Sequence, residues 1–287
     1  MTENTYLYSG FQKAVIYALN TKGRPAAQTG GLVYAGVEVY ATKLYNLTIP
    51  PARRVPHIGN DRLLATQIFP SQEPVTGELS VGAEDLELIE VVTGLTIKTI
   101  AGANMLPHMT DQQGNEPVVG MLMWQAAVAK ATKAQGIHFH IVPNTQAVPR
   151  LPGAGENPID LVYDLAPNPT EYHLWGEALA PLADIYDPLS GVSDTGAFES
   201  GLWSGFIDYP MRIASFIAAG AQVEFLFPAS RPAISSDETK CAVFTGAQTD
   251  DALELVDPAD YTLATSGVTF SVAPGVGVEV QIVYQHR

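Results

Sequence analysis

Cysteine and charge are both scarce in this chain of 287 residues. It contains a single cysteine, Cys241, which excludes an internal disulfide framework. Charged residues make up 16% of the sequence, against roughly 25% in ordinary soluble domains, while hydrophobic residues make up 46%. A folded core is therefore expected, and the low charge favours a surface that is partly buried in an assembly.

Long hydrophobic runs are missing as well. The longest, such as Val118–Val128, are far shorter than the roughly 20 residues that a membrane-spanning helix needs. The first ten residues, MTENTYLYSG, have neither the basic nor the apolar region of a signal peptide. We therefore expect a soluble protein made in a reducing cytoplasm.

Basic residues are rare in the second half of the chain. Residues 1–150 hold 11 Lys and Arg and 11 Asp and Glu, whereas residues 151–287 hold 4 basic and 19 acidic residues, which accounts for the whole net charge of −15. Tight wrapping of nucleic acid is not expected, because it requires clustered Lys and Arg. An acidic surface is useful in another way, since it repels DNA and lets it slide; simple solubility is the alternative explanation.

Patterns typical of catalysis are also lacking. His138 and His140 alternate along a predicted strand and are the best metal candidates, but no third ligand has a diagnostic spacing. Ser204 lies in Gly201-Leu-Trp-Ser-Gly205, which is not the spacing of a nucleophile elbow. We therefore expect no enzyme activity, no cofactor and no metal.

Short alternating runs dominate the chain and predict a mainly β fold. Two stretches stay ambiguous: Val118–Ala131 suits a helix or, preferably, the first strand of a long hairpin with Ile137–Val142, and Tyr209–Ala219 suits a short helix or a strand. Asp184–Gly205 has the Gly, Ser and Asp content of a loop. The other predicted strands before residue 228 are Phe11–Leu19, Val37–Leu47, Arg62–Phe69, Val75–Val81, Thr96–Ile100, Ile159–Leu165, Glu171–Glu177 and Gln222–Phe227.

The stretch from Ala52 to Leu95 is the most structured by pattern. Thr48–Asp61 has three prolines and two adjacent arginines, which predicts a long loop that cannot enter a sheet interior. Two strands follow, joined by the turn Pro70–Pro74. Gly82–Thr93 then predicts a helix with acidic residues in its first turn and a left-handed cap at Gly94.

The last 60 residues have a composition of their own. Pro228 and Pro232 bracket a predicted linker, after which turns and alternating strands predict a small all-β module. We expect two domains, residues 1–227 and 228–287. The predicted strands of the module are Lys240–Thr245, Tyr261–Ala264, Val268–Val272 and Val278–Tyr284.

A basic loop with His-x-Gly-x-Asp, a strand, a Gly-centred second strand and an acidic helix ending in Thr-Gly occur in this order. The pattern resembles the major tail tube proteins of long-tailed, siphovirus-type bacteriophages. The similarity extends more weakly from Gly10 to Phe227. The residues that carry it are Arg53, Arg54, His57, Gly59, Asp61, Gly77, Glu78, Asp85, Leu86 and Gly94.

The resemblance implies a β-sandwich with one flanking α-helix, subunits in stacked hexameric rings, and a virion tail assembled in the host cytoplasm. Arg53, Arg54, His57 and Asp61 would form an inter-ring assembly arm, and Asp85, Leu86 and Ile89 would belong to the flanking helix. The C-terminal module would lie outside the tube. Expected partners are other copies of the chain, the tape measure, tail terminator and distal tail proteins, and genomic DNA passing through an acidic lumen without specific binding. Alternatives are another β-rich virion protein, such as a tail terminator or capsid decoration, and a cupin-like metalloenzyme using His138 and His140.

Overall fold

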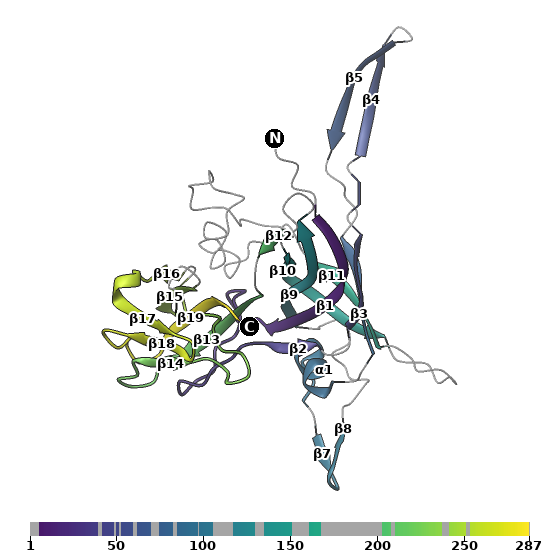
Figure 1. Ribbon diagram of the computed structural model, residues 1–287. Helices are drawn as coiled ribbons and strands as arrows, with labels where there is room; N and C mark the ends of the chain where they lie inside the picture. The colour runs from purple at the N-terminus through teal and green to yellow at the C-terminus, as the bar shows by residue number, and fades with distance from the viewer. Residues whose placement is uncertain are drawn as a thin grey trace.

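The chain is mainly β, as its alternating patterns predict. The structure, a computed structural model, describes residues 6–39, 42–48, 50–51, 53–59, 62–69, 75–82, 85–96, 98–105, 117–129, 135–150, 161–167, 203–207, 210–236, 241–250 and 253–286. These residues form antiparallel sheets and one α-helix (Figure 1). Within them, no helix has the length and hydropathy to cross a membrane.

The largest sheet has eight strands in the order β2-β1-β9-β10-β11-β6-β3, with β12 also pairing with β10. The first part of β10 pairs with β12 and its last part pairs with β11. β3, the last strand in this order, also approaches β1, the second strand, so that the sheet curves back on itself. Its strands are β1 (Tyr6–Ala18), β2 (Val37–Val39), β3 (Thr42–Thr48), β6 (Thr76–Val81), β9 (Val118–Ala129), β10 (Gln135–Arg150), β11 (Leu161–Pro167) and β12 (Trp203–Ile207).

The hairpin interpretation of Val118–Ala131 is confirmed, since β9 and β10 pair antiparallel from Val118↔Gln146 to Val128↔Gln135. The predicted single strand Val37–Leu47 is two strands: β2 pairs with β1, and β3 pairs with β6. Part of the predicted loop Asp184–Gly205 is also strand, because β12 begins at Trp203. The predicted strand Glu171–Glu177 and the turn Pro70–Pro74 lie outside the described residues.

Helix α1 (Leu86–Thr93) covers one face of the eight-stranded sheet (Figure 1). Alternate residues of the strands point toward it, as the period of two along a strand requires. Ile16, Met121 and Met123 lie in this apolar core together with Leu88 and Val92 of the helix, and all five are at most 1% exposed.

The opposite face of the eight-stranded sheet packs on a second sheet, in the order β13-β19-β15-β16. Val15, Leu122 and Trp124 come from the large sheet, and Ile213 and Val283 come from the second sheet. The strands of the second sheet are β13 (Met211–Ile217), β15 (Cys241–Ala247), β16 (Glu254–Leu255) and β19 (Val278–Gln285).

A third, three-stranded sheet covers the far side of the second one, in the order β14-β18-β17. Phe216, Phe225 and Phe270 pack edge to face between these two sheets. The all-β character of the C-terminal segment is thus confirmed. The strands are β14 (Glu224–Leu226), β17 (Tyr261–Ala264) and β18 (Gly267–Phe270), and the 3-10 turn η2 (Pro258–Asp260) leads into β17.

The C-terminal sheets include strands from before residue 228, where the sequence predicted a domain boundary. β13 pairs with β19, and β14 pairs with β18. The predicted linker is also packed, since Ala233 is 4% exposed and its backbone N–H donates to the carbonyl of Thr265. Residues 211–286 of the described chain therefore pack as one β unit beside the large sheet.

Candidate assembly surfaces

A two-stranded hairpin projects away from the body of the molecule (Figure 1). It is formed by β4 (Arg53–Gly59) and β5 (Arg62–Phe69), which pair from Arg53↔Phe69 to Gly59↔Arg62 with an irregularity after His57. The predicted loop over Thr48–Asp61 is therefore wrong for Arg53–Gly59. Each strand of a two-stranded ribbon has one free edge, and such an edge tolerates Pro56, which has no N–H to donate.

The predicted arm residues lie on this hairpin as far as the structure describes them. Arg53 and Arg54 stand opposite Phe69 and Ile68, and His57 stands opposite Ala65. Asp61 lies outside the described residues. The backbone thus brings the two arginines to the base of the hairpin and the histidine nearer its tip.

The predicted flanking helix is present and begins one residue after Asp85. The Asp85 carboxylate accepts hydrogen bonds from the backbone N–H groups of Glu87 (3.0 Å) and Leu88 (3.4 Å), which makes Asp85 the N-cap. Gly94 takes the left-handed conformation at φ 70°, and its N–H donates to the carbonyl of Glu90 at 2.8 Å, as predicted for the C-cap. Local capping chemistry therefore determines both ends of α1.

Two of the three predicted helix residues serve the fold of the subunit itself. Ile89 is 4% exposed and packs inward, and Asp85 is used by the cap. Leu86 is half-buried at the first helical position. A partner that touches α1 would therefore meet its outer side, where Glu87 is exposed.

The margins of the large sheet are a second candidate surface. Among the described strands, β3 pairs on one side only, with β6, and the Tyr6–Lys13 part of β1 pairs only with β9. The short hairpin of β7 (Lys98–Ile100) and β8 (Ala103–Met105) projects from the end of the molecule opposite to the β4–β5 hairpin (Figure 1). Unpaired strand edges are templates for pairing with another chain.

His138 and His140 lie side by side on β10, as their spacing predicts, with ring centroids 4.6 Å apart. The amide nitrogen of Gln125 lies 3.4 Å from Nδ1 of His138. Burial lowers the pKa of both histidines, and together with the neighbouring His138 it lowers the pKa of His140 to about 4. The described residues contain no cluster of three or more His, Cys, Asp or Glu side chains that could hold a metal.

A cluster of charges that the sequence did not predict lies between the large sheet and the second sheet. The Glu38 carboxylate is 9% exposed and forms ion pairs with Lys13 at 2.5 Å and with Arg212 and Arg231. Burial would raise the pKa of this carboxyl, but hydrogen bonds from Arg231 and Lys13 and the charge of Arg212 outweigh burial and lower it to about 2. The cluster ties β1 and β2 to the C-terminal unit.

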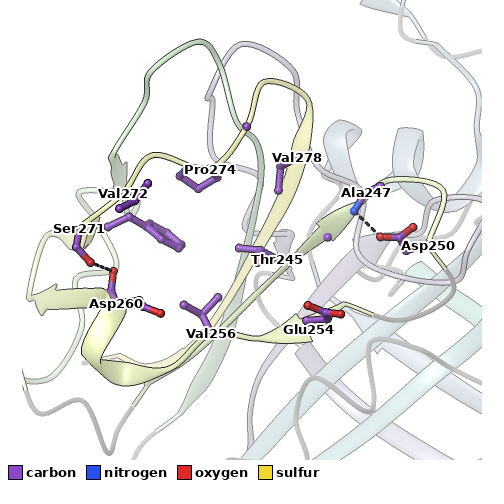
Figure 2. A pocket seen from close by; sticks show the side chains of 13 residues that line it. Thr245, Ala247, Asp250, Glu254, Val256, Asp260, Ser271, Val272, Pro274 and Val278 are labelled. Carbon is purple, nitrogen blue, oxygen red and sulfur yellow. Dashed lines mark hydrogen bonds between the residues drawn. The ribbon is translucent and has the colours of Figure 1, made fainter.

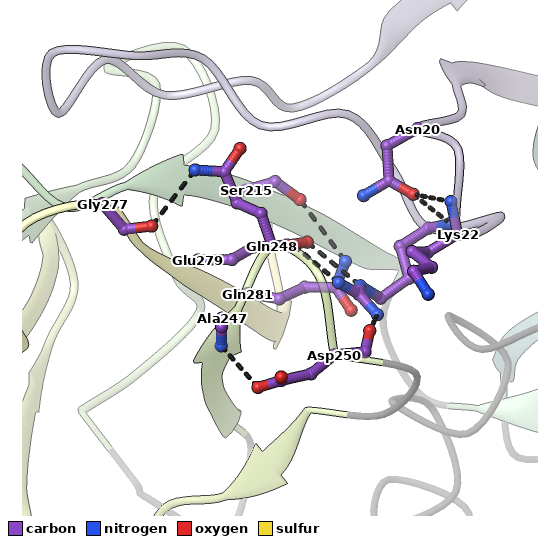
Figure 3. Close-up of polar contacts among 10 residues, drawn as sticks. Asn20, Lys22, Ser215, Ala247, Gln248, Asp250, Gly277, Glu279 and Gln281 are labelled. Atoms are coloured by element: carbon purple, nitrogen blue, oxygen red, sulfur yellow. Dashed lines mark hydrogen bonds and ion pairs between the residues drawn. The ribbon is translucent and has the colours of Figure 1, made fainter.

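A second, more deeply buried ion pair joins Arg24, in the connection between β1 and β2, to Glu279 of β19 (Figure 3). The guanidinium of Arg24 donates to both oxygens of Glu279, at 3.2 and 2.8 Å, and both side chains are 1% exposed. Arg24 also donates to the backbone carbonyl of Asp250 at 2.8 Å. The sequence does contain a signal for both clusters, namely a single charged residue within an otherwise apolar strand. The examples are Arg212 in MRIASFI and Glu279 in VEVQIVY.

No protein-family model matches this sequence, and a search of curated proteins finds no match either. The candidate surfaces therefore have to be interpreted from their own geometry.

Proposed function

We propose that this chain is a structural virion protein that assembles with copies of itself into the stacked rings of a bacteriophage tail tube. The observation that carries the proposal is the projecting β4–β5 hairpin, which occupies the position of the predicted assembly arm. An isolated two-stranded hairpin is only marginally stable in water. In this proposal, docking on a neighbouring subunit stabilises the projecting hairpin.

The margins of the large sheet support the same proposal, since β3 approaches β1 within the subunit but pairs only with β6 among the described strands. In a ring, the strand edges of neighbouring subunits pair or cover one another, which removes edges that would otherwise aggregate. Contacts around a ring and between rings are head-to-tail, so that growth along the tube axis stays open. In this proposal the sandwich of the tube domain lines the wall, six copies close each ring, and the C-terminal unit faces outward.

The charge distribution is compatible with a conduit for DNA. The net charge of −15 comes from residues 151–287, and low overall charge suits a subunit that hides much of its surface. A lumen lined in part by carboxylates repels the DNA backbone and keeps it from adhering. The role proposed is mechanical, with no catalytic step.

The test is electron microscopy of the purified full-length chain over a range of concentrations. Tubes of uniform bore are the expected result. Closed rings would favour a tail terminator, and a compact monomer at every concentration would contradict self-assembly. Because His138 and His140 are adjacent, metal analysis belongs in the same experiment: a stoichiometric metal lost in His140→Ala would favour a metalloenzyme instead.

The arm assignment has a separate test. The double variant Arg53→Glu, Arg54→Glu should stay folded, because both positions lie on a hairpin that projects from the body, yet it should fail to form tubes. The matched control is Arg53→Lys, Arg54→Lys, which keeps both positive charges and should still assemble. Normal tube growth by the charge-reversed variant would remove the hairpin from the assembly mechanism.

A further inference from the structure

The C-terminal unit carries a groove (Figure 2). Its volume is about 820 Å³. It lies between the ends of the second and third sheets, where Thr245 of β15 and Phe270 of β18 face the same space. A hollow of this size is large enough to take several side chains of a partner.

The charges that line the groove all have one sign. Asp250, Glu254 and Asp260 lie along it, and no Lys or Arg is among its lining residues. The Asp250 carboxylate accepts a hydrogen bond from the N–H of Ala247 at 2.7 Å, whereas Glu254 is exposed. The groove therefore presents a negative potential to whatever enters it.

The groove also has an apolar side. Phe270, Val256 and Val278 form part of its wall, and Val272 at its rim is 80% exposed. Val276 (76% exposed) belongs to the same loop between β18 and β19 as Val272. An occupant that fits has to be cationic and apolar at once.

The β4–β5 hairpin has this combination in its sequence. The two strands carry Arg53, Arg54 and Arg62 and no carboxylate. They also carry Val55, Ile58, Leu63, Leu64, Ile68 and Phe69. Eight strand residues span roughly 25 Å, which is long enough to reach across a subunit boundary.

The hairpin points away from the C-terminal unit of its own chain, so the same molecule does not supply the occupant (Figure 1). We propose that the acidic groove of one subunit, lined by Asp250, Glu254 and Asp260, receives the basic β4–β5 hairpin of a second copy of the chain. This inference rests on the proposed self-assembly and names the surface that the hairpin meets. Charge complementarity of this kind steers the encounter and fixes which partner is accepted.

The groove is tested by the full-length double variant Glu254→Lys, Asp260→Lys. Asp250 is left intact because its carboxylate and its carbonyl both hold the local structure. The variant should fold as the unchanged protein does, by circular dichroism and thermal unfolding. It should raise the concentration needed for assembly by at least about tenfold, because two charge contacts with the hairpin become repulsive.

Two further variants make the result specific. Glu224→Lys with Ala229→Lys and Ala264→Lys changes the net charge equally at exposed positions of the C-terminal unit, outside the groove, and should assemble at the unchanged concentration. The quadruple variant Arg53→Glu, Arg54→Glu, Glu254→Lys, Asp260→Lys exchanges the charges of hairpin and groove. It should recover assembly that either pair of substitutions alone impairs.

The outcomes separate this inference from the proposed function. If the unchanged protein forms tubes and the groove variant forms them at the same concentration, the groove does not receive the hairpin and the tube proposal stands. Failure of the charge exchange to restore assembly likewise overturns the pairing of these two surfaces. If the unchanged protein never assembles, the proposed function fails, and this inference fails with it.

Discussion

On one face of the eight-stranded sheet, Ile16, Met121 and Met123 pack beneath α1, and the buried charged side chains of the described residues, Arg24, Arg212 and Glu279, all lie elsewhere. On the other face, the packing against the second sheet includes two ion-pair clusters, centred on Glu38 and Glu279. Both faces are buried, but the contacts that hold them differ in kind. The first depends on apolar area, and the second depends in addition on the geometry of charged groups.

The difference concerns how strictly each face sets the position of its partner. Apolar packing is non-directional and tolerates rearrangement of similar volume. A buried ion pair is favourable only in one geometry, because desolvation of the two charges has to be offset by their contact. The two clusters therefore hold the C-terminal unit in a defined orientation, which positions its groove relative to the eight-stranded sheet.

The largest expected effect comes from breaking the deeper ion pair. Glu279→Ala leaves the guanidinium of Arg24 buried without its carboxylate, which should lower the free energy of unfolding by about 3–5 kcal/mol. Urea denaturation followed by fluorescence measures the change. The paired control, Arg24→Met with Glu279→Leu, removes both charges and should recover most of the loss. If Glu279→Ala were as stable as the unchanged protein, the loss of the Glu279 carboxylate would not lower the free energy of unfolding, which would contradict this prediction.

The apolar face was largely predictable from sequence, and the charged face was not. The extended run Ile137–Val142 indicated the β9–β10 hairpin, and Gly94 indicated the end of α1, because both signals are local. Glu38 and Arg212 are 174 residues apart, and nothing near either residue specifies the other. Such contacts depend on the tertiary fold.

The candidate site was predicted only in part, for the same kind of reason. Arg53 and Arg54 led to the prediction of an assembly arm in this segment. Pro56, one of its three prolines, led to the prediction of a loop where the structure has β4. Pro56 fits in the strand because a two-stranded ribbon leaves one edge of each strand unpaired, and that β4 and β5 pair only with each other among the described strands depends on the tertiary fold and not on the residue itself. The sequence did not predict the acidic groove, because its carboxylates lie on separate segments that only the folded sheets bring together.

A second, smaller effect should appear as a dependence on pH. The pKa of the Glu38 carboxyl is about 2 in the folded protein, below the ordinary value of 4.5. The unfolded chain therefore binds the proton more readily than the folded one. The stability that the cluster provides is fully present above pH 4.5 and is lost as the pH falls toward 2. The effect is smaller than that of Glu279, because Lys13 and Arg231 are about a quarter exposed and solvent weakens their ion pairs.

The measurement compares Glu38→Gln with the unchanged protein by urea denaturation at pH 6 and at pH 3. The unchanged protein should lose more stability between these two values than the variant, which has no carboxyl to titrate at this position. An equal loss in both proteins would mean that Glu38 is not the group responsible. Glu224→Gln, on the exposed side of β14, is the matched control and should behave as the unchanged protein does.

The smallest effect belongs to the apolar face and tests whether α1 depends on its own cap or on the sheet beneath it. Asp85→Ala removes the acceptor for the N–H groups of Glu87 and Leu88 and should lower the free energy of unfolding by about 1 kcal/mol. Asp85→Asn keeps an acceptor and should restore most of the loss. Leu88 is 1% exposed, so packing holds the helix in place even without the cap. A loss as large as that of Glu279→Ala would show instead that the helix terminus, and not the apolar core, holds α1 on the sheet.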